Sequence, residues 1–209
     1  VMSVMNGFRA ELLDRILGLN GHLEISAARG SLKGYSKISG KINGIQGVIS
    51  ATPVVEGQVL LSANRVSRGA VARGMSADGI RAKPLLKDGI LTGTLEGFDD
   101  GTGVLIGRRM SERFGLRVGD KVTFIAPRGT TTAFGTMPRM KAYSVAAIFE
   151  VGMSEYDSSF VFMPIAAAQT FFRQKGGVSH IEVTTEHADK IDQVRSEIFT
   201  AVGPTLWVR

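Results

Sequence analysis

The chain has 209 residues, of which 44% are hydrophobic and 21% are charged, a balance typical of a globular protein with a core and not of a disordered chain. Its 25 Lys and Arg outnumber its 19 Asp and Glu, and the formal charge of +6 favours an acidic protein, an anionic membrane surface or nucleic acid as partner. The absence of cysteine excludes disulfides, thiol catalysis and Cys-based metal sites.

The first predicted element is an amphipathic helix near the start of the chain. Val4, Phe8, Leu12 and Ile16 recur every four residues, and Gly18 follows them. The chain begins without Met and without the charged region of a signal peptide, and no run approaches the roughly 18 apolar residues that span a bilayer. We therefore expect a piece of a longer protein, whose remainder could include membrane segments.

A strand, a helix and a second strand are predicted next. Residues 22–27 alternate as a strand, and Ser36 is a plausible N-cap for a short helix. A strand region follows at residues 48–62, and we expect interruptions at Pro53 and Gly57 because both residues weaken strands.

The C-terminal end repeats this order of elements. The patterns predict a strand at residues 180–185, a helix at 188–202 and a strand at 205–208. Strand–helix–strand units at both ends can pair into one split βαβ sheet with its helices on one face. We therefore predict an α+β fold with one subdomain formed by residues 1–65 and 178–209.

The middle of the chain, residues 66–177, is then an inserted β-rich subdomain. Its one clear helix is predicted at residues 107–114. Residues 160–164 read as a buried strand, and residues 165–173 as a short helix that ends before two glycines.

A long hairpin is the most unusual feature of the insertion. Residues 121–126 and 141–151 alternate apolar and polar side chains, which is typical of paired strands, and residues 127–140 connect them. Hairpin loops normally have about 2–5 residues, and loops beyond roughly 12–15 are usually functional or disordered. The length of this connection therefore indicates a functional loop.

The connection contains no acidic residue and combines cations with apolar side chains. The cations in and beside it are Arg128, Arg139 and Lys141, and the large apolar side chains are Phe134, Met137 and Met140. Desolvation of Phe and Met provides affinity, whereas Arg selects an acidic partner. We predict a docking surface, with packing of Phe134 and Met137 onto their own hairpin as the alternative.

Signals for catalysis, cofactors and metals are weak. His22, His180 and His187 are far apart in sequence, and none has the spacing of a helical zinc site. Residues 99–103 lack the ligand alternation of a calcium loop, and the glycines of residues 101–107 do not fit a dinucleotide motif. We therefore expect no enzyme, cofactor or metal, with a hydrolase of unrecognised site as the competing hypothesis.

Two clusters of arginine could bind phosphates. They comprise Arg65, Arg68 and Arg73, and separately Arg108, Arg109, Arg113 and Arg117. Aromatic residues are poorly interleaved with them, as single-strand binding would require. We interpret both clusters as solvated basic faces and expect no nucleic-acid partner.

Several segments resemble one known family. Residues 3–25, 104–122, 134–139 and 157–172 are similar to the periplasmic domain of LolC/LolE-type subunits. These are membrane subunits of the ABC transporter that releases lipoproteins from the bacterial inner membrane. The most specific motif is SVMNGF at residues 3–8, which in the family follows the first transmembrane helix. The resemblance implies a domain at the periplasmic face of that membrane.

The resemblance also implies an architecture and a binding site. The subdomain from both chain ends would be Porter-like, and the insertion would be Sabre-like, with a hook at residues 127–141 that recruits a LolA-like periplasmic lipoprotein carrier. Gly135 and Pro138 match the G-x-x-P pattern of that hook. Its implied residues are Phe134, Gly135, Thr136, Met137, Pro138 and Arg139, and the candidates for a carrier-facing pad are Arg128, Met140 and Lys141.

Further partners follow from the resemblance. Lipoprotein substrates would pass to the carrier, and ATP hydrolysis would occur in a separate cytoplasmic subunit of the full transporter. Residues 157–164 resemble the hookless member of the family's subunit pair as much as the hooked one, which favours a homodimer over a LolC/LolE-type heterodimer. The alternative is the adaptor-docking domain of a MacB-like efflux transporter, which should lack such a hairpin.

Overall fold

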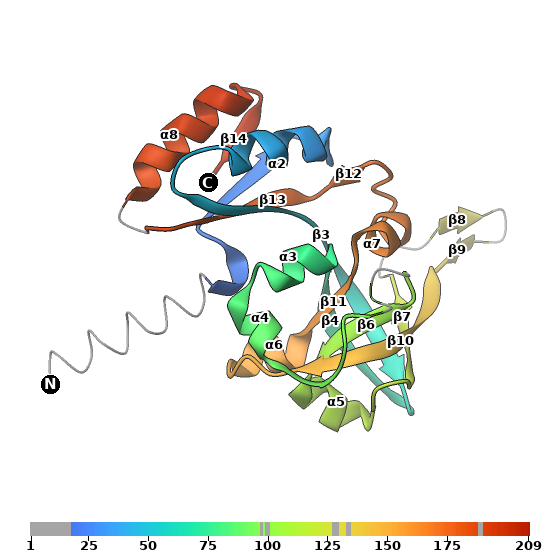
Figure 1. The fold of residues 1–209 in the computed structure, drawn as a ribbon. Helices are drawn as coiled ribbons and strands as arrows, with labels where there is room; N and C mark the ends of the chain where they lie inside the picture. The colour runs from blue at the N-terminus through green and yellow to red at the C-terminus, as the bar shows by residue number, and fades with distance from the viewer. Residues whose placement is uncertain (1–17, 97, 99–100, 127–129, 133–134, 188–189) are drawn as a thin grey trace, which may run out of the picture.

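One long strand, β3 (Val48–Ala63), joins a helix-covered sheet to a body of further strands. The computed structural model describes residues 18–96, 98, 101–126, 130–132, 135–187 and 190–209. Figure 1 shows a helix-covered sheet above a β-rich body, with β3 running from one into the other. The helix expected at residues 4–16 lies outside the described residues.

The upper sheet has the predicted split βαβ pattern. Its strand order is β14 (Leu206–Val208), β1 (Leu23–Ala27), β13 (His180–Thr185) and β3, with every pair antiparallel. Helix α2 (Tyr35–Asn43) connects β1 to β3, and α8 (Ile191–Val202) connects β13 to β14. Figure 1 shows both helices over the same face. Their contact with the sheet buries apolar side chains, among them Ile25, Ile42, Ile181, Val183, Val194 and Ile198.

The predicted breaks in β3 are wrong, since the strand is continuous. Pro53 lies where β3 is the edge of the upper sheet and pairs only with Ile181 of β13, so its missing N–H disrupts no second ladder. At Gly57 the ring of Phe172 comes within 2.3 Å of where a Cβ would stand. Only glycine leaves room for this ring to pack on the backbone, and β3 continues past Gly57 without a break.

The predicted cap of α2 is also wrong. The helix begins at Tyr35, and Gly34 is its N-cap with a φ of 65°, a left-handed conformation that glycine adopts without strain. The Gly34 carbonyl accepts from the amides of Lys37 and Ile38. Ser36 therefore lies within the first turn and does not cap it.

The lower body is a barrel that closes through β3. The strand order around the barrel is β3, β4 (Val66–Met75), β11 (Phe160–Pro164), β6 (Gly103–Gly107), β10 (Met140–Phe149) and β7 (Lys121–Ile125). Strand β7 then pairs with β3 and closes the barrel. β5 (Ile90–Gly93) adds to β10. Leu61, Phe124 and Tyr143 are among the side chains buried inside. Full closure leaves few free strand edges in this body.

Short helices and one small ribbon complete the structure. Helix α5 (Arg108–Phe114) confirms the predicted helix, and α7 (Ile165–Phe171) confirms the next one. Helices α3 (Ala77–Arg81), α4 (Pro84–Asp88) and α6 (Ser154–Ser159) were not expected, because one turn and a half creates no periodicity. β2 (Leu32–Lys33) pairs with β12 (Gly177–Val178).

A buried ionic cluster links the upper sheet to the lower body. Glu182 of β13 lies 2.7 Å from Lys83 Nζ and 3.1 Å from Arg73 Nη1, and the side chains of Lys83 and Glu182 are each 3% exposed. Arg73 also pairs with Glu56 at 2.7 Å. Burial by itself would raise the pKa of Glu182, but the nearby His180 and the charges of Lys83 and Arg73 lower it below the ordinary value.

The same cluster holds the segment that leads into β1. Lys83 Nζ donates to the Leu19 carbonyl at 2.6 Å, and Arg73 Nη1 donates to Asn20 Oδ1 at 3.0 Å. Gly21 then takes a φ of 72° and turns the chain into the upper sheet. Residues 19–21 are therefore attached to the lower body although the strand they precede belongs to the upper sheet.

Candidate docking site

A two-stranded ribbon projects from the barrel at the predicted hairpin. β7 and β10 pair from Met140–Ile125 to Ser144–Lys121, which confirms the long hairpin. Its connection carries β8 (Thr130–Thr132) and β9 (Gly135–Met137), antiparallel to each other. Figure 1 shows this ribbon extending away from the body. Of the predicted hook residues, Gly135, Thr136 and Met137 form the backbone of β9. Arg128 and Phe134 lie outside the described residues.

Arg139 anchors the foot of the ribbon. Its Nη1 donates to the Phe171 carbonyl at 2.5 Å, and its guanidinium carbon lies 6.0 Å from the centroid of the Phe171 ring. Phe171 is the last residue of α7, where helix carbonyls are free and a cation is favoured. Burial and the charge of Arg173 lower the pKa of Arg139. Arg139 is half-buried and directed towards the body of the protein.

The pad candidates Met140 and Lys141 lie on opposite faces of β10, because successive strand residues alternate. Met140 is 61% exposed and stands opposite Ile125 on the outer wall of the barrel. Lys141 stands opposite Phe124, and its Nζ lies 5.1 Å from the centroid of the Tyr143 ring. The structure therefore does not bring these two side chains together on one surface.

Tyr143 brings a buried hydroxyl to this end of the barrel. The residue is 2% exposed, its hydroxyl has no hydrogen-bond partner among the described residues, and its ring packs edge-on against Phe124 with centroids 4.9 Å apart. Burial raises the pKa of Tyr143 to about 12.

Tyr143→Phe is expected to leave the protein as stable as before at pH 7, or more stable by about 1 kcal/mol, because it removes an unsatisfied polar group. In the native chain the folded pKa of about 12 exceeds the ordinary value of 10.0, so ionisation of Tyr143 opposes folding and the protein keeps its full stability only below pH 10. That stability is lost as the pH rises from 10 through 12. Urea unfolding between pH 8 and pH 12 should show a smaller loss in the variant, and equal slopes would contradict this.

A groove hollows the outer wall of the barrel beside the ribbon's foot. It encloses about 650 Å³, and its lining is mainly apolar. The lining residues are Gln58, Val59, Leu60, Gly69, Ala70, Val71, Ile125, Ala126, Pro138 and Ser159. Sequence reasoning missed this groove. Its one local signal is the run Val59–Leu61, since three consecutive apolar residues in a strand must place at least one on the outer face.

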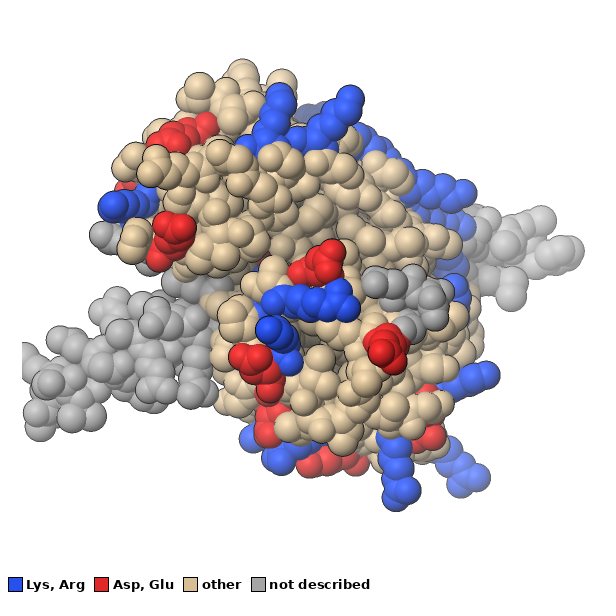
Figure 2. Space-filling model, in the orientation of Figure 1, with Lys and Arg blue, Asp and Glu red and all other residues tan. Residues whose placement is uncertain are grey.

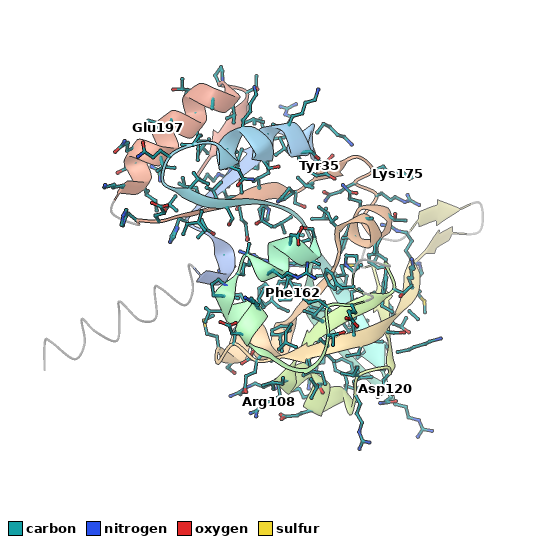
Figure 3. All side chains as sticks on the ribbon, viewed as in Figure 1. Tyr35, Arg108, Asp120, Phe162, Lys175 and Glu197 are labelled. Atoms are coloured by element: carbon teal, nitrogen blue, oxygen red, sulfur yellow. The ribbon has the colours of Figure 1, made fainter. Side chains whose placement is uncertain are left out.

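Basic side chains flank the ribbon. Figure 2 shows Lys and Arg gathered over α2 and along the side from which the ribbon projects. Lys33, Lys37, Lys41 and Lys175 are exposed there, and Figure 3 shows Lys175 on the turn after α7. This side of the molecule suits an acidic partner.

Neither a metal cluster nor a membrane-spanning helix occurs in the described part of the chain. No group of three or more His, Asp and Glu within it could hold a metal ion. None of its helices is both long enough and apolar enough to cross a bilayer. His22 and His180 serve structural contacts, since His22 Nδ1 accepts from the Thr185 amide at 2.8 Å and His180 lies 3.6 Å from Glu182.

The chain belongs to the family of MacB-like periplasmic core domains, whose model matches residues 1–200. The family places it on the periplasmic side of the inner membrane. Among solved structures, the periplasmic region of MacB from Actinobacillus actinomycetemcomitans superposes with a TM-score of 0.60 at 12% identity, covering 95% of this chain and 93% of that one.

A second solved structure agrees on the fold. It is the extracellular domain of the noncanonic ABC-type transporter YknZ from Gram-positive bacteria, with a TM-score of 0.58, 17% identity and coverage of 90% of this chain and 98% of that one. At these identities the likeness concerns the fold alone.

Sequence relatives confirm the resemblance to LolC/LolE-type subunits. The "Lipoprotein-releasing system transmembrane protein LolC" of Neisseria meningitidis serogroup B is 30% identical over 211 residues, and that of Xylella fastidiosa strain Temecula1 is 28% identical over 213. Both alignments cover 100% of this chain and 51% of the relative. LolE of Haemophilus influenzae is 24% identical over 180 residues, which cover 81% of this chain and 42% of that protein. The chain thus spans about half the length of the curated relatives it matches.

Proposed function

We propose that this chain is the periplasmic domain of a lipoprotein-releasing transporter subunit, and that its ribbon, residues 127–141, is a hook that recruits a LolA-like periplasmic lipoprotein carrier. The observation that carries the proposal is the ribbon itself, which extends β7 and β10 beyond the barrel and ends in its own strand pair. The LolC and LolE names of the relatives supply the lipoprotein context.

The contacts at the ribbon's foot support this role. Arg139 attaches the ribbon to α7, and an anchored hook loses less conformational entropy on binding than a free loop does. We propose that Arg139 mainly holds the hook in position. Phe134, Met137 and Pro138 then provide the apolar contact, while Arg128, Lys141 and the exposed lysines of this side orient an acidic carrier surface.

The remaining partners are proposed on the same basis. Lipoprotein substrates pass from the transporter to the carrier, and ATP is hydrolysed in a separate cytoplasmic subunit. The full protein works as a homodimer or as a LolC/LolE-type heterodimer. Residues 1–65 and 178–209 would form a Porter-like subdomain and residues 66–177 a Sabre-like one. The shared strand β3 would couple motion at the membrane to the hook.

Met137→Ala and Phe134→Ala are each expected to weaken carrier binding by about 1–3 kcal/mol, the range of interface hot spots. Titration calorimetry of the 209-residue chain with the purified LolA-like carrier of the same bacterium measures this. Leu91→Ala is the matched control, because Leu91 is a 51% exposed apolar residue on β5, beside the end of β10 remote from the ribbon. Unchanged affinity in both ribbon variants would refute the hook. Binding to an efflux adaptor in place of the carrier would favour a MacB-like role.

A further inference from the structure

The strand register places a row of residues across the outer wall of the barrel at the ribbon's foot. Met140 stands opposite Ile125, Ile125 opposite Leu60, and Leu60 opposite Gly69. Directly opposed residues share a face, and the neighbours Val59 and Phe124 are buried on the inner face. The row therefore faces outward from β10 across β7 and β3 to β4.

The side chains of this row are apolar, and at one end of the row a side chain is missing. Met140 is 61% exposed and Leu60 is 39% exposed. The row ends at Gly69, which has no side chain, and the groove opens at this position. The next outward-facing pair, Gln58 and Val71, also lines the groove. A single exposed Leu needs no explanation, but a contiguous apolar hollow with uncharged walls indicates a binding surface.

The groove continues the surface of the ribbon. Pro138 lies between β9 and β10, in the connection that forms the ribbon, and it also lines the groove. Three steps between strands about 4.8 Å apart make the row roughly 14 Å wide. A protein that buries about 800 Å² on each side covers a patch roughly twice as wide. A partner of ordinary footprint that holds the ribbon therefore reaches the groove.

We propose that the groove is a second docking subsite for the carrier and receives apolar side chains from the carrier's surface. This inference rests on the proposed function, since the ribbon determines which partner lies over the groove. The lining contains no charged residue, so the occupant is an apolar protein surface and not an anionic headgroup. The ribbon and the exposed lysines that flank it would then orient the carrier, whereas the groove would add contact area from which water is excluded.

Gly69 allows the groove to be filled without disturbing the fold. No atom lies within 4 Å of the position that a Cβ would take at Gly69, and its φ is outside the left-handed range. Gly69→Leu should therefore place a side chain in the groove, and a strand position tolerates Leu better than Gly. Leu91→Ala is again the control, because Leu91 lies on β5, outside the groove and beside the end of β10 remote from the ribbon.

The experiment measures carrier affinity by calorimetry for the 209-residue chain and its Gly69→Leu, Leu91→Ala and Met137→Ala variants, after thermal unfolding has shown that each folds. We expect Gly69→Leu to weaken binding at least tenfold and Leu91→Ala to leave it unchanged. The variant Leu60→Ala removes part of the apolar lining without filling the groove, and it should also weaken binding. Comparing it with Gly69→Leu separates the loss of apolar contact from steric blocking.

Different failures are distinguishable. If Gly69→Leu and Leu60→Ala bind like the unmodified chain while Met137→Ala loses affinity, the groove is no carrier contact and the hook stands. If Met137→Ala and Phe134→Ala also bind normally, the proposed function itself fails. A dimer seen in sedimentation and lost in Gly69→Leu, with unchanged carrier affinity, would assign the groove to a second copy and overturn the proposal. A fluorescent fatty acid that binds the unmodified chain but not Gly69→Leu, again with unchanged carrier affinity, would overturn it in favour of an acyl chain.

Discussion

Glu182→Leu is expected to lower the free energy of unfolding by about 3–5 kcal/mol, the range measured when one partner of a buried ion pair is removed. The carboxylate is 3% exposed and lies between two cations, Lys83 at 2.7 Å and Arg73 at 3.1 Å. Leucine would leave both cations buried together. Because Glu182 belongs to the upper sheet and the two cations to the lower body, the variant should also loosen the attachment between them.

Urea unfolding at pH 7 measures this loss. Lys87→Met is the control, because Lys87 is an exposed lysine on α4, four residues after Lys83, and it should change stability by no more than about 0.5 kcal/mol. A loss below about 1 kcal/mol in Glu182→Leu would contradict the role of the cluster.

The pH dependence provides a second test of the cluster. The folded pKa of Glu182 lies below its ordinary value of 4.5, so its stabilisation is present above pH 4.5 and is lost as the pH falls through the lower folded pKa. Glu182→Gln should therefore flatten the decline of stability in acid.

Gly74→Ala is expected to destabilise the protein by about 2–3 kcal/mol, because the new methyl group would overpack the core. A Cβ at Gly74 would stand 2.1 Å from the Cβ of Ala168 in α7. Gly74 is paired on both sides, with Met163 of β11 and Val55 of β3, so the strand has no room to move. Helix α7 would have to shift and carry the Phe171 carbonyl away from Arg139, which should also weaken carrier binding.

Two further variants separate overpacking from a general effect of alanine. Gly69→Ala lies on the same strand in open space and should change stability by less than about 0.5 kcal/mol. The double variant Gly74→Ala with Ala168→Gly removes the clash, so it should regain part of the lost free energy of unfolding. The recovery is reduced by about 1 kcal/mol, because glycine disfavours the helix relative to alanine. The single variant Ala168→Gly completes the double-mutant cycle, which is measured by chemical denaturation of the unmodified chain, both single variants and the double variant. Strictly additive losses would show that the two sites do not clash.

Local sequence patterns were sufficient for most of the regular elements. The alternation at residues 121–126 and 141–151 predicted β7 and β10, and the repeated strand–helix–strand order at both ends predicted the split βαβ sheet. Helices α3, α4 and α6 were missed because five or six residues contain too few turns to show a period. The length and composition of the hairpin connection predict a docking loop from local sequence alone, and this role stays a prediction.

By itself, the sequence determined the strand and helix periods, the long acid-free connection and the kinship with lipoprotein-releasing subunits, all of which are properties of neighbouring residues or of whole segments. Tertiary structure alone decided how those segments meet. Closure of the barrel through β3, the ring of Phe172 over Gly57 and the turn of Arg139 towards α7 each join residues distant in the chain. The groove has the same origin, because Leu60, Gly69 and Ile125 become neighbours only when three strands align in register.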